Sequence, residues 1–214
     1  ILVAVYRLLD FKEAVNLWKT DKNDFSMFVI TVLATVFIGI EEGIIVGFLV
    51  SMIFVIYQIS YPSVVELGKE PQTQEYRNIE RFDTLEVDDT VLIVRLDAQL
   101  FFANLNHFQN KLIFFEERKP KLKVIIIDAR AINSMDSSTL HFLHDLIHDY
   151  KARGIRLCFA GIKGRVRDLF QKMNLVKMIG RENFFINIDH AIEHIKDNKV
   201  NHYSSITLQS NVVQ

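Results

Sequence analysis

The chain has 214 residues, of which 50% are hydrophobic and 11% aromatic, and its formal net charge is −1. Without an excess of positive charge it offers no electrostatic surface to a polyanion, which argues against a nucleic-acid partner. The single cysteine, Cys158, excludes an internal disulfide, and its place in an apolar run predicts a buried thiol in a reducing compartment.

The first residues are apolar but lack the basic region and the cleavage site of a signal peptide. We interpret them as the end of an earlier membrane helix, and the chain as the C-terminal part of a longer membrane protein. Residues 10–24 then form a charged connector. Its lysines and Trp18 suit the boundary between lipid headgroups and water.

Residues 25–59 form an apolar run that only Glu41 and Glu42 interrupt with charge. A single helix of this length would extend for about 50 Å, well beyond a hydrocarbon core of about 30 Å. Gly39 and Gly43 flank the glutamates, and glycine has poor helix propensity. We therefore predict a hairpin of two short membrane helices, at residues 25–40 and 43–59. This hairpin closes a membrane domain at residues 1–60 and leaves the rest of the chain in the cytoplasm.

The two glutamates have two interpretations. Carboxylates within a membrane are functional candidates by default, and Glu41 and Glu42 would then take part in ion coupling. At the turn of the hairpin the same side chains would face water and carry no such role. Both interpretations stay open.

Residues 61–90 are largely polar and contain glycine and proline, which predicts a linker with an edge strand at residues 64–67. Strands are predicted at residues 91–96 and 122–127, and the second reads as fully buried because it is nearly continuous and β-branched. Between them, apolar residues at helical spacing follow Asn104, a good N-cap residue. Strand, helix and strand in this order imply a parallel pair with a right-handed crossover.

The same pattern repeats toward the C-terminus. Helices are predicted at residues 138–151, 165–173 and 188–196, and strands at residues 155–160 and 184–186. Residues 91–197 thus form the core of one α/β domain with a mostly parallel sheet flanked by helices. The polar residues 198–214 lack periodicity and are predicted to be disordered.

The turn after the strand at 122–127 is the clearest candidate site, because α/β domains place their sites beyond the carboxyl ends of parallel strands. Asp128 closes this strand, and Asp136, Ser137 and Ser138 open the next helix. A phosphate on either serine would accept hydrogen bonds from backbone amides at the start of that helix. Asp and Ser are also ordinary N-cap residues, which is the simpler interpretation.

Other chemical signals are weak. His141, His144 and His148 share one side of a helix, but this side is opposite the apolar stripe, so we interpret it as a solvated face rather than a metal site. The loop at residues 161–165 lacks the Walker pattern and reads as a basic surface loop. No nucleophile–base–acid arrangement, dinucleotide fingerprint or paired-cysteine motif is present. We therefore predict neither an enzyme nor a bound cofactor.

Two groups of residues, taken in order, carry a resemblance to a known family. The helical part contributes Lys22, Asp24-Phe25, Thr31, Thr35, Gly39, Glu41, Gly43, Gly47 and Ser51. The α/β part contributes Leu67-Gly68, Tyr76-Arg77-Asn78, Leu96-Asp97-Ala98, Phe101-Phe102-Ala103-Asn104, Asp128 and Asp136-Ser137-Ser138. The first group resembles the last two membrane helices of the SulP sulfate permease family, and the second resembles the STAS domain that follows them.

This resemblance implies a multi-pass secondary active transporter of anions such as sulfate, bicarbonate or a dicarboxylate, coupled to H⁺ or Na⁺ and assembled as a homodimer. In such transporters the substrate lies between broken helices, which would here lie upstream of Ile1. The hairpin would belong to the supporting scaffold. The short Lys119-Pro120-Lys121 connection implies a bacterial protein of the inner membrane, because vertebrate relatives carry a long insertion there.

The resemblance also implies that Ser138, and after it Ser137, is a phosphoacceptor, although Thr139 stands where the family pattern has glycine. A membrane-tethered partner-switching module that signals through Ser138 is therefore an alternative function. A third possibility, a soluble flavodoxin-like enzyme or receiver using Asp128, requires residues 25–59 to be buried inside the protein.

Overall fold

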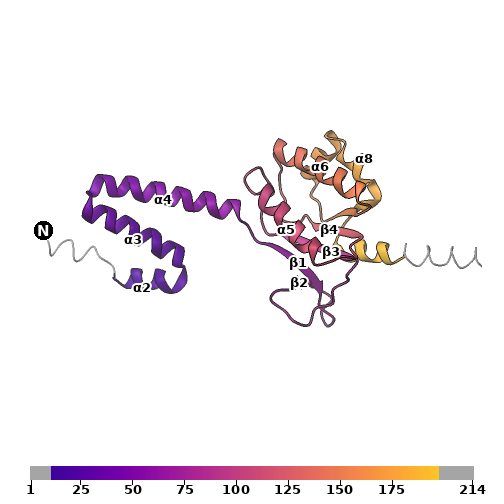
Figure 1. Ribbon diagram of the computed structural model, residues 1–214, viewed down its shortest axis with the longest axis horizontal. Helices are drawn as coiled ribbons and strands as arrows, with labels where there is room; N and C mark the ends of the chain where they lie inside the picture. Colours follow the sequence, from indigo (N-terminus) through magenta and orange to yellow (C-terminus); the bar gives the residue numbers. More distant parts are fainter. Residues whose placement is uncertain (1–10, 198–214) are drawn as a thin grey trace, which may run out of the picture. The chain divides into compact units, whose positions relative to one another are not determined.

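The computed structural model describes residues 11–197, and the chain divides into two compact units between Ile59 and Ser60. Figure 1 gives the order of the helices and strands along the chain. The apolar first residues and the tail at 198–214, for which we predict a helix end and a disordered segment, lie outside the described residues.

The N-terminal unit is helical and consists of α2 (Phe11–Thr20), α3 (Lys22–Phe37) and α4 (Ile40–Ser60). The Asp21 carboxylate accepts the backbone N–H groups of Asn23 at 2.7 Å and Asp24 at 3.4 Å, which starts α3. Among the described residues, α4 is the one helix long and apolar enough to cross a membrane, with 21 residues and a mean hydropathy of 2.2. The 16 residues of α3 extend for only about 24 Å.

The break between α3 and α4 differs from the predicted one. The turn lies at Ile38 and Gly39, where Gly39 has a φ of +151° that other residues rarely adopt. Glu41 and Glu42 are therefore not the turn itself but the exposed first turn of α4, where acidic side chains complement the helix dipole. The two helices occupy residues 22–37 and 40–60, not 25–40 and 43–59.

Two glycines of α4 allow α3 to approach closely, and Figure 1 shows these helices side by side and antiparallel. A Cβ atom at Gly43 would lie 2.7 Å from Thr35 Cα, and one at Gly47 would lie 2.9 Å from Thr31 Cγ2. Each threonine hydroxyl donates to a carbonyl of its own helix at 2.8 Å, so these polar groups are satisfied within α3. The predicted helical hairpin is confirmed.

The C-terminal unit contains a six-stranded sheet of order β2-β1-β3-β4-β5-β6. Its strands are β1 (Val64–Lys69), β2 (Tyr76–Asn78), β3 (Val91–Leu96), β4 (Val124–Asp128), β5 (Arg156–Ala160) and β6 (Phe184–Phe185). The strands from β3 to β6 are parallel, whereas β1 is antiparallel to both β2 and β3. The predicted parallel core is confirmed.

The prediction of an edge strand at residues 64–67 is wrong. β1 lies inside the sheet, between β2 and β3, and five of its six residues are buried. Its edge neighbour β2 has three half-buried residues and no apolar run, so no strand could be predicted there from hydrophobic pattern. Glu66 is buried in the middle of β1. A charged residue in a short apolar segment is typical of an edge strand, and this is why the sequence did not indicate an interior one.

Helices cover both faces of the sheet. They are α5 (Leu105–Glu117), α6 (Ser137–Ala152), α7 (Gly164–Lys172), α8 (Leu175–Ile179) and a last helix that is described from residue 188 to 197. Ile125 and Ile127 of β4 pack in the cluster that contains α5 and α6. Val124 and Ile126 face the last helix on the other side, which explains why β4 reads as a continuous apolar run.

Candidate functional site

Asp136 joins two loops that follow the carboxyl ends of neighbouring strands, β3 and β4. Its Oδ1 accepts the backbone N–H of Thr139 at 2.8 Å, as an N-cap of α6, and lies 2.6 Å from Thr139 Oγ1. Its Oδ2 accepts the backbone N–H of Phe102 at 3.0 Å, in the loop after β3. The capping role was predicted, whereas the link to Phe102 was not.

The pKa of Asp136 reflects these contacts. Partial burial acts to raise the pKa of this carboxyl, but the hydrogen bonds from Thr139 and from the Phe102 N–H together hold it below its usual value. The carboxylate is thus ionised whenever the domain is folded near neutral pH.

Ser137 and Ser138 are exposed in the first turn of α6, whereas Thr139 is fully buried. Besides its contact with Asp136, the Thr139 hydroxyl lies 3.2 Å from the carbonyl of Leu100. The threonine that replaces the family's glycine therefore ties α6 to the loop after β3. Both serines remain accessible for modification at the start of a helix.

Asp128 ends β4 as predicted, but its carboxylate is closed by a neighbour. Its side chain is 1% exposed, and Arg130 contacts both carboxylate oxygens, with Nε at 2.9 Å from Oδ1 and Nη2 at 2.7 Å from Oδ2. A bidentate guanidinium leaves this carboxylate no free face for a phosphoryl group or a metal. This geometry argues against a receiver-type use of Asp128.

The loop after β3 is held by Asn104. The sequence suggested this residue as an N-cap of α5, but its side chain makes no capping hydrogen bond to that helix. Instead it accepts the N–H of Phe101 at 3.1 Å and donates to the carbonyl of Gln99 at 2.9 Å. The two hydrogen bonds of the Asn104 side chain therefore fix the loop that carries the exposed Phe102.

We expect Asp136→Ala to lower the free energy of unfolding by about 0.5–2 kcal/mol near neutral pH, because α6 loses its cap and the Phe102 amide loses its acceptor. The folded-state pKa of Asp136 is lowered, so its stabilisation is present above the unfolded carboxyl pKa of about 4 and is lost as pH falls through the folded value. Chemical denaturation at neutral and acid pH measures this, with Asp145→Ala on the same helix as an exposed control. A deficit that persists unchanged in acid would contradict it.

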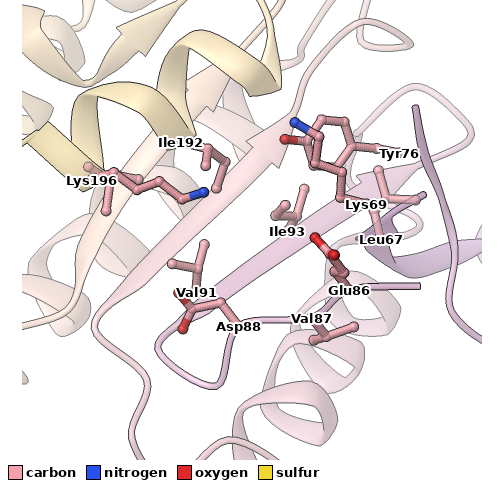
Figure 2. A pocket seen from close by; sticks show the side chains of 11 residues that line it. Leu67, Lys69, Tyr76, Glu86, Val87, Asp88, Val91, Ile93, Ile192 and Lys196 are labelled. Carbon is pink, nitrogen blue, oxygen red and sulfur yellow. The ribbon is translucent and has the colours of Figure 1, made fainter. Parts of the chain in front are cut away.

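A second feature is a cavity of about 360 Å³ beside the last helix, on the other face of the sheet (Figure 2). Its apolar walls come from β1, β3 and the last helix, at Leu67, Val91, Ile93, Ile192 and Ile195. At its edge the Tyr76 hydroxyl donates to Asp189 Oδ1 at 3.2 Å, and burial followed by the charge of Asp189 raises the pKa of Tyr76. This cavity could not be predicted from the sequence, because the residues of its walls are far apart along the chain.

The remaining predicted groups do not assemble into a reactive site. His144 lies 3.2 Å from Asp145 on the exposed side of α6, and His141 and His148 are exposed as well. Within residues 11–197, no three His, Cys, Asp or Glu side chains gather as metal ligands would. Burial raises the pKa of the Cys158 thiol to about 11.

The class of this protein is defined by a helical hairpin, with one helix long and apolar enough to cross a membrane, followed by an α/β domain with a mostly parallel six-stranded sheet. Residues 84–191, just over half of the chain, match the family model described as the STAS domain. The chain therefore belongs to the STAS domain family, as the resemblance implied.

Sequence similarity extends beyond the STAS domain into the helical unit. Sulfate transporter 4.1, chloroplastic, from Arabidopsis thaliana is 32% identical over 203 residues, which cover 90% of this chain and 30% of the relative. Sulfate transporter 1.2 from the same plant is 27% identical over 202 residues, covering 90% and 31%. The chain is thus homologous to SulP sulfate transporters, and it spans about a third of their length.

A solved structure has the same fold. The murine Slc26a9 anion transporter in its inward-facing state superimposes with a TM-score of 0.76 over 89% of this chain and 31% of that chain, at 22% sequence identity. The named relatives are transporters rather than enzymes. These relatives come from a plant and a mouse, and the bacterial origin that the resemblance implied stays a prediction.

Proposed function

We propose that this chain is the C-terminal portion of a secondary active transporter of inorganic anions, of the sulfate, bicarbonate or dicarboxylate class. The observation that supports this most strongly is the similarity to sulfate transporters across both the hairpin and the STAS domain. In this proposal, residues 1–60 close the transmembrane domain and residues 91–197 form the core of a STAS domain that assists assembly or regulation.

The arrangement has further consequences. The anion site lies in helices upstream of Ile1, and the complete protein is a multi-pass homodimer driven by H⁺ or Na⁺, with its STAS domain in the cytoplasm. We assign it to a bacterial inner membrane. Support for the bacterial assignment is the short connection at Lys119-Pro120-Lys121, where α5 and β4 are joined without an insertion.

Uptake of radiolabelled anions by the full-length protein in liposomes tests this function. Sulfate, bicarbonate and dicarboxylates are compared, each with an imposed H⁺ or Na⁺ gradient and with none. Gradient-driven uptake of one of these anions supports the proposal, and no uptake of any of them rejects it.

Glu41→Gln in the same assay should shift the pH dependence of uptake if this carboxylate takes part in coupling, whereas unchanged uptake leaves it as a helix-terminal residue.

Exposure of Ser137 and Ser138 favours a second candidate function, a membrane-tethered signalling module that switches partners on phosphorylation. We expect Ser138→Ala to abolish phosphorylation without loss of stability, because the Ser138 side chain is exposed and Asp136 keeps the cap. Mass spectrometry of protein from cells measures the modification, with Ser137→Ala as the matched variant. Phosphate that persists on Ser138→Ala and disappears from Ser137→Ala would move the site by one residue.

A further inference from the structure

One side of α5 carries a row of basic and aromatic residues. The row begins at His107, which contacts the segment that follows α4. His107 Nε2 lies 3.0 Å from the carbonyl of Pro62, and the His107 ring packs edge-on against Tyr61 with ring centroids 5.2 Å apart. Pro62 is only two residues beyond the end of α4. The helix α5 is therefore fastened to the chain where the chain leaves the apolar helix.

Further along this row of α5, the aromatic ring of Phe114 lies between the cations of Lys111 and Arg118. Lys111, Phe114 and Arg118 follow His107 at spacings of four, three and four residues, which places them on one side of a helix. Lys111 Nζ lies 5.6 Å from the Phe114 ring centroid, and Arg118 Cζ lies 5.4 Å from it. The Phe114 ring thus lies between two cations on the side of α5 that faces away from the core.

Two large apolar side chains of α5 are exposed. Phe114 is 45% exposed and its neighbour Ile113 is 46% exposed, whereas the core side chains of α5 are almost completely buried. Glu117 is the one exposed acidic residue of the helix, since Glu116 is bound to Tyr150 and Arg153. An exposed aromatic residue with flanking cations fits the boundary of a membrane that contains anionic lipids.

We propose that the surface formed by Lys111, Ile113, Phe114 and Arg118 docks on an anionic lipid surface. The apolar side chains enter the headgroup region, and the two cations pair with lipid phosphates. The contact of His107 with Pro62 favours a lipid surface over a soluble protein partner, because it fastens this helix to the segment next to α4. The proposal does not depend on which anion is transported.

A fluorescent label at position 114 tests the docking. Phe114→Cys provides a selective attachment point, because Cys158, the only native cysteine, is buried. The full chain is placed in nanodiscs of phosphatidylcholine alone or with phosphatidylglycerol. We expect the emission of an environment-sensitive dye at this position to rise about twofold with the anionic lipid, and lipid-attached quenchers to reduce it.

Two variants provide the controls. Lys111→Glu with Arg118→Glu should remove the response to anionic lipid at position 114 while leaving the melting temperature within about 2 °C. A label at Ile186→Cys, which is 77% exposed on another part of the domain, should not respond. Equal emission in both lipids, or a rise in emission that lipid-attached quenchers do not reduce, would overturn the proposal.

Discussion

Lys119→Met is expected to lower the free energy of unfolding of the STAS domain by about 3–5 kcal/mol, because it breaks a buried ion pair. Lys119 Nζ lies 3.0 Å from Glu66 Oε1 and donates to the carbonyl of Asp88 at 2.8 Å. The two side chains of this ion pair are only 5% and 4% exposed. Removal of the ammonium leaves a carboxylate buried in β1 without its counter-charge.

Hydrogen exchange of the β3 and β4 amides measures this loss, because amides of the central strands exchange through global unfolding. A loss of this size accelerates their exchange by roughly 100- to 4,000-fold. Lys69→Met is the matched control, since Lys69 forms a more exposed ion pair with Asp189 and should change stability by about 1 kcal/mol or less. Similar losses of stability in Lys119→Met and Lys69→Met would contradict the prediction that the buried ion pair is the more important one.

A double substitution distinguishes an isolated charge from lost packing. If the penalty of Lys119→Met arises from the unpaired Glu66, then Glu66→Leu added to it should recover a large part of the stability. An additive further loss would mean that shape, rather than charge, dominates at this position.

Gly43→Ala is expected to destabilise the hairpin by about 1–3 kcal/mol, because the added methyl group meets Thr35 of α3. Its Cβ would lie 2.7 Å from a backbone atom, Thr35 Cα, which cannot move without shifting α3. Gly47→Ala should have a smaller effect, since its closest neighbours are side-chain atoms of Thr31 at 2.9 Å. Thermal unfolding of the full chain in detergent measures the order of these effects.

Ile44→Ala is the control for this series. Ile44 is next to Gly43 in sequence but is 67% exposed within the described structure, so its truncation removes no packing against α3. The expected order of destabilisation is therefore Gly43→Ala, then Gly47→Ala, then Ile44→Ala. An equal response of both glycines and Ile44 would show that the close approach of the two helices does not stabilise the hairpin.

Periodicity and composition by themselves determined most of the secondary structure. The apolar run at residues 25–59 is too long for one helix, and only a break near its glycines resolves this. The alternation of buried strands with amphipathic helices likewise fixes a parallel α/β core, because each strand reads as apolar on both faces. Asp136 was recognisable as a cap because the position before an apolar helical pattern favours this residue type.

Other features depended on contacts between residues far apart in the chain. The place of β1 inside the sheet could not be read from its sequence, because a buried Glu66 resembles an exposed residue until Lys119 is brought to it. The same holds for the link from Asp136 to Phe102, which spans 34 positions. Arg130 is only two residues from Asp128, but the contact of its guanidinium with the carboxylate depends on the conformation of the chain after β4.

The sequence alone thus determined that an apolar helical hairpin is joined to a mostly parallel α/β domain, because hydrophobic length and period depend only on the order of residues. The tertiary structure decided which charges are paired, which serines are exposed and which side of α5 carries its unburied aromatic ring. These properties depend on distances that folding sets between separate segments, and it is they that define where the domain can be modified or bound.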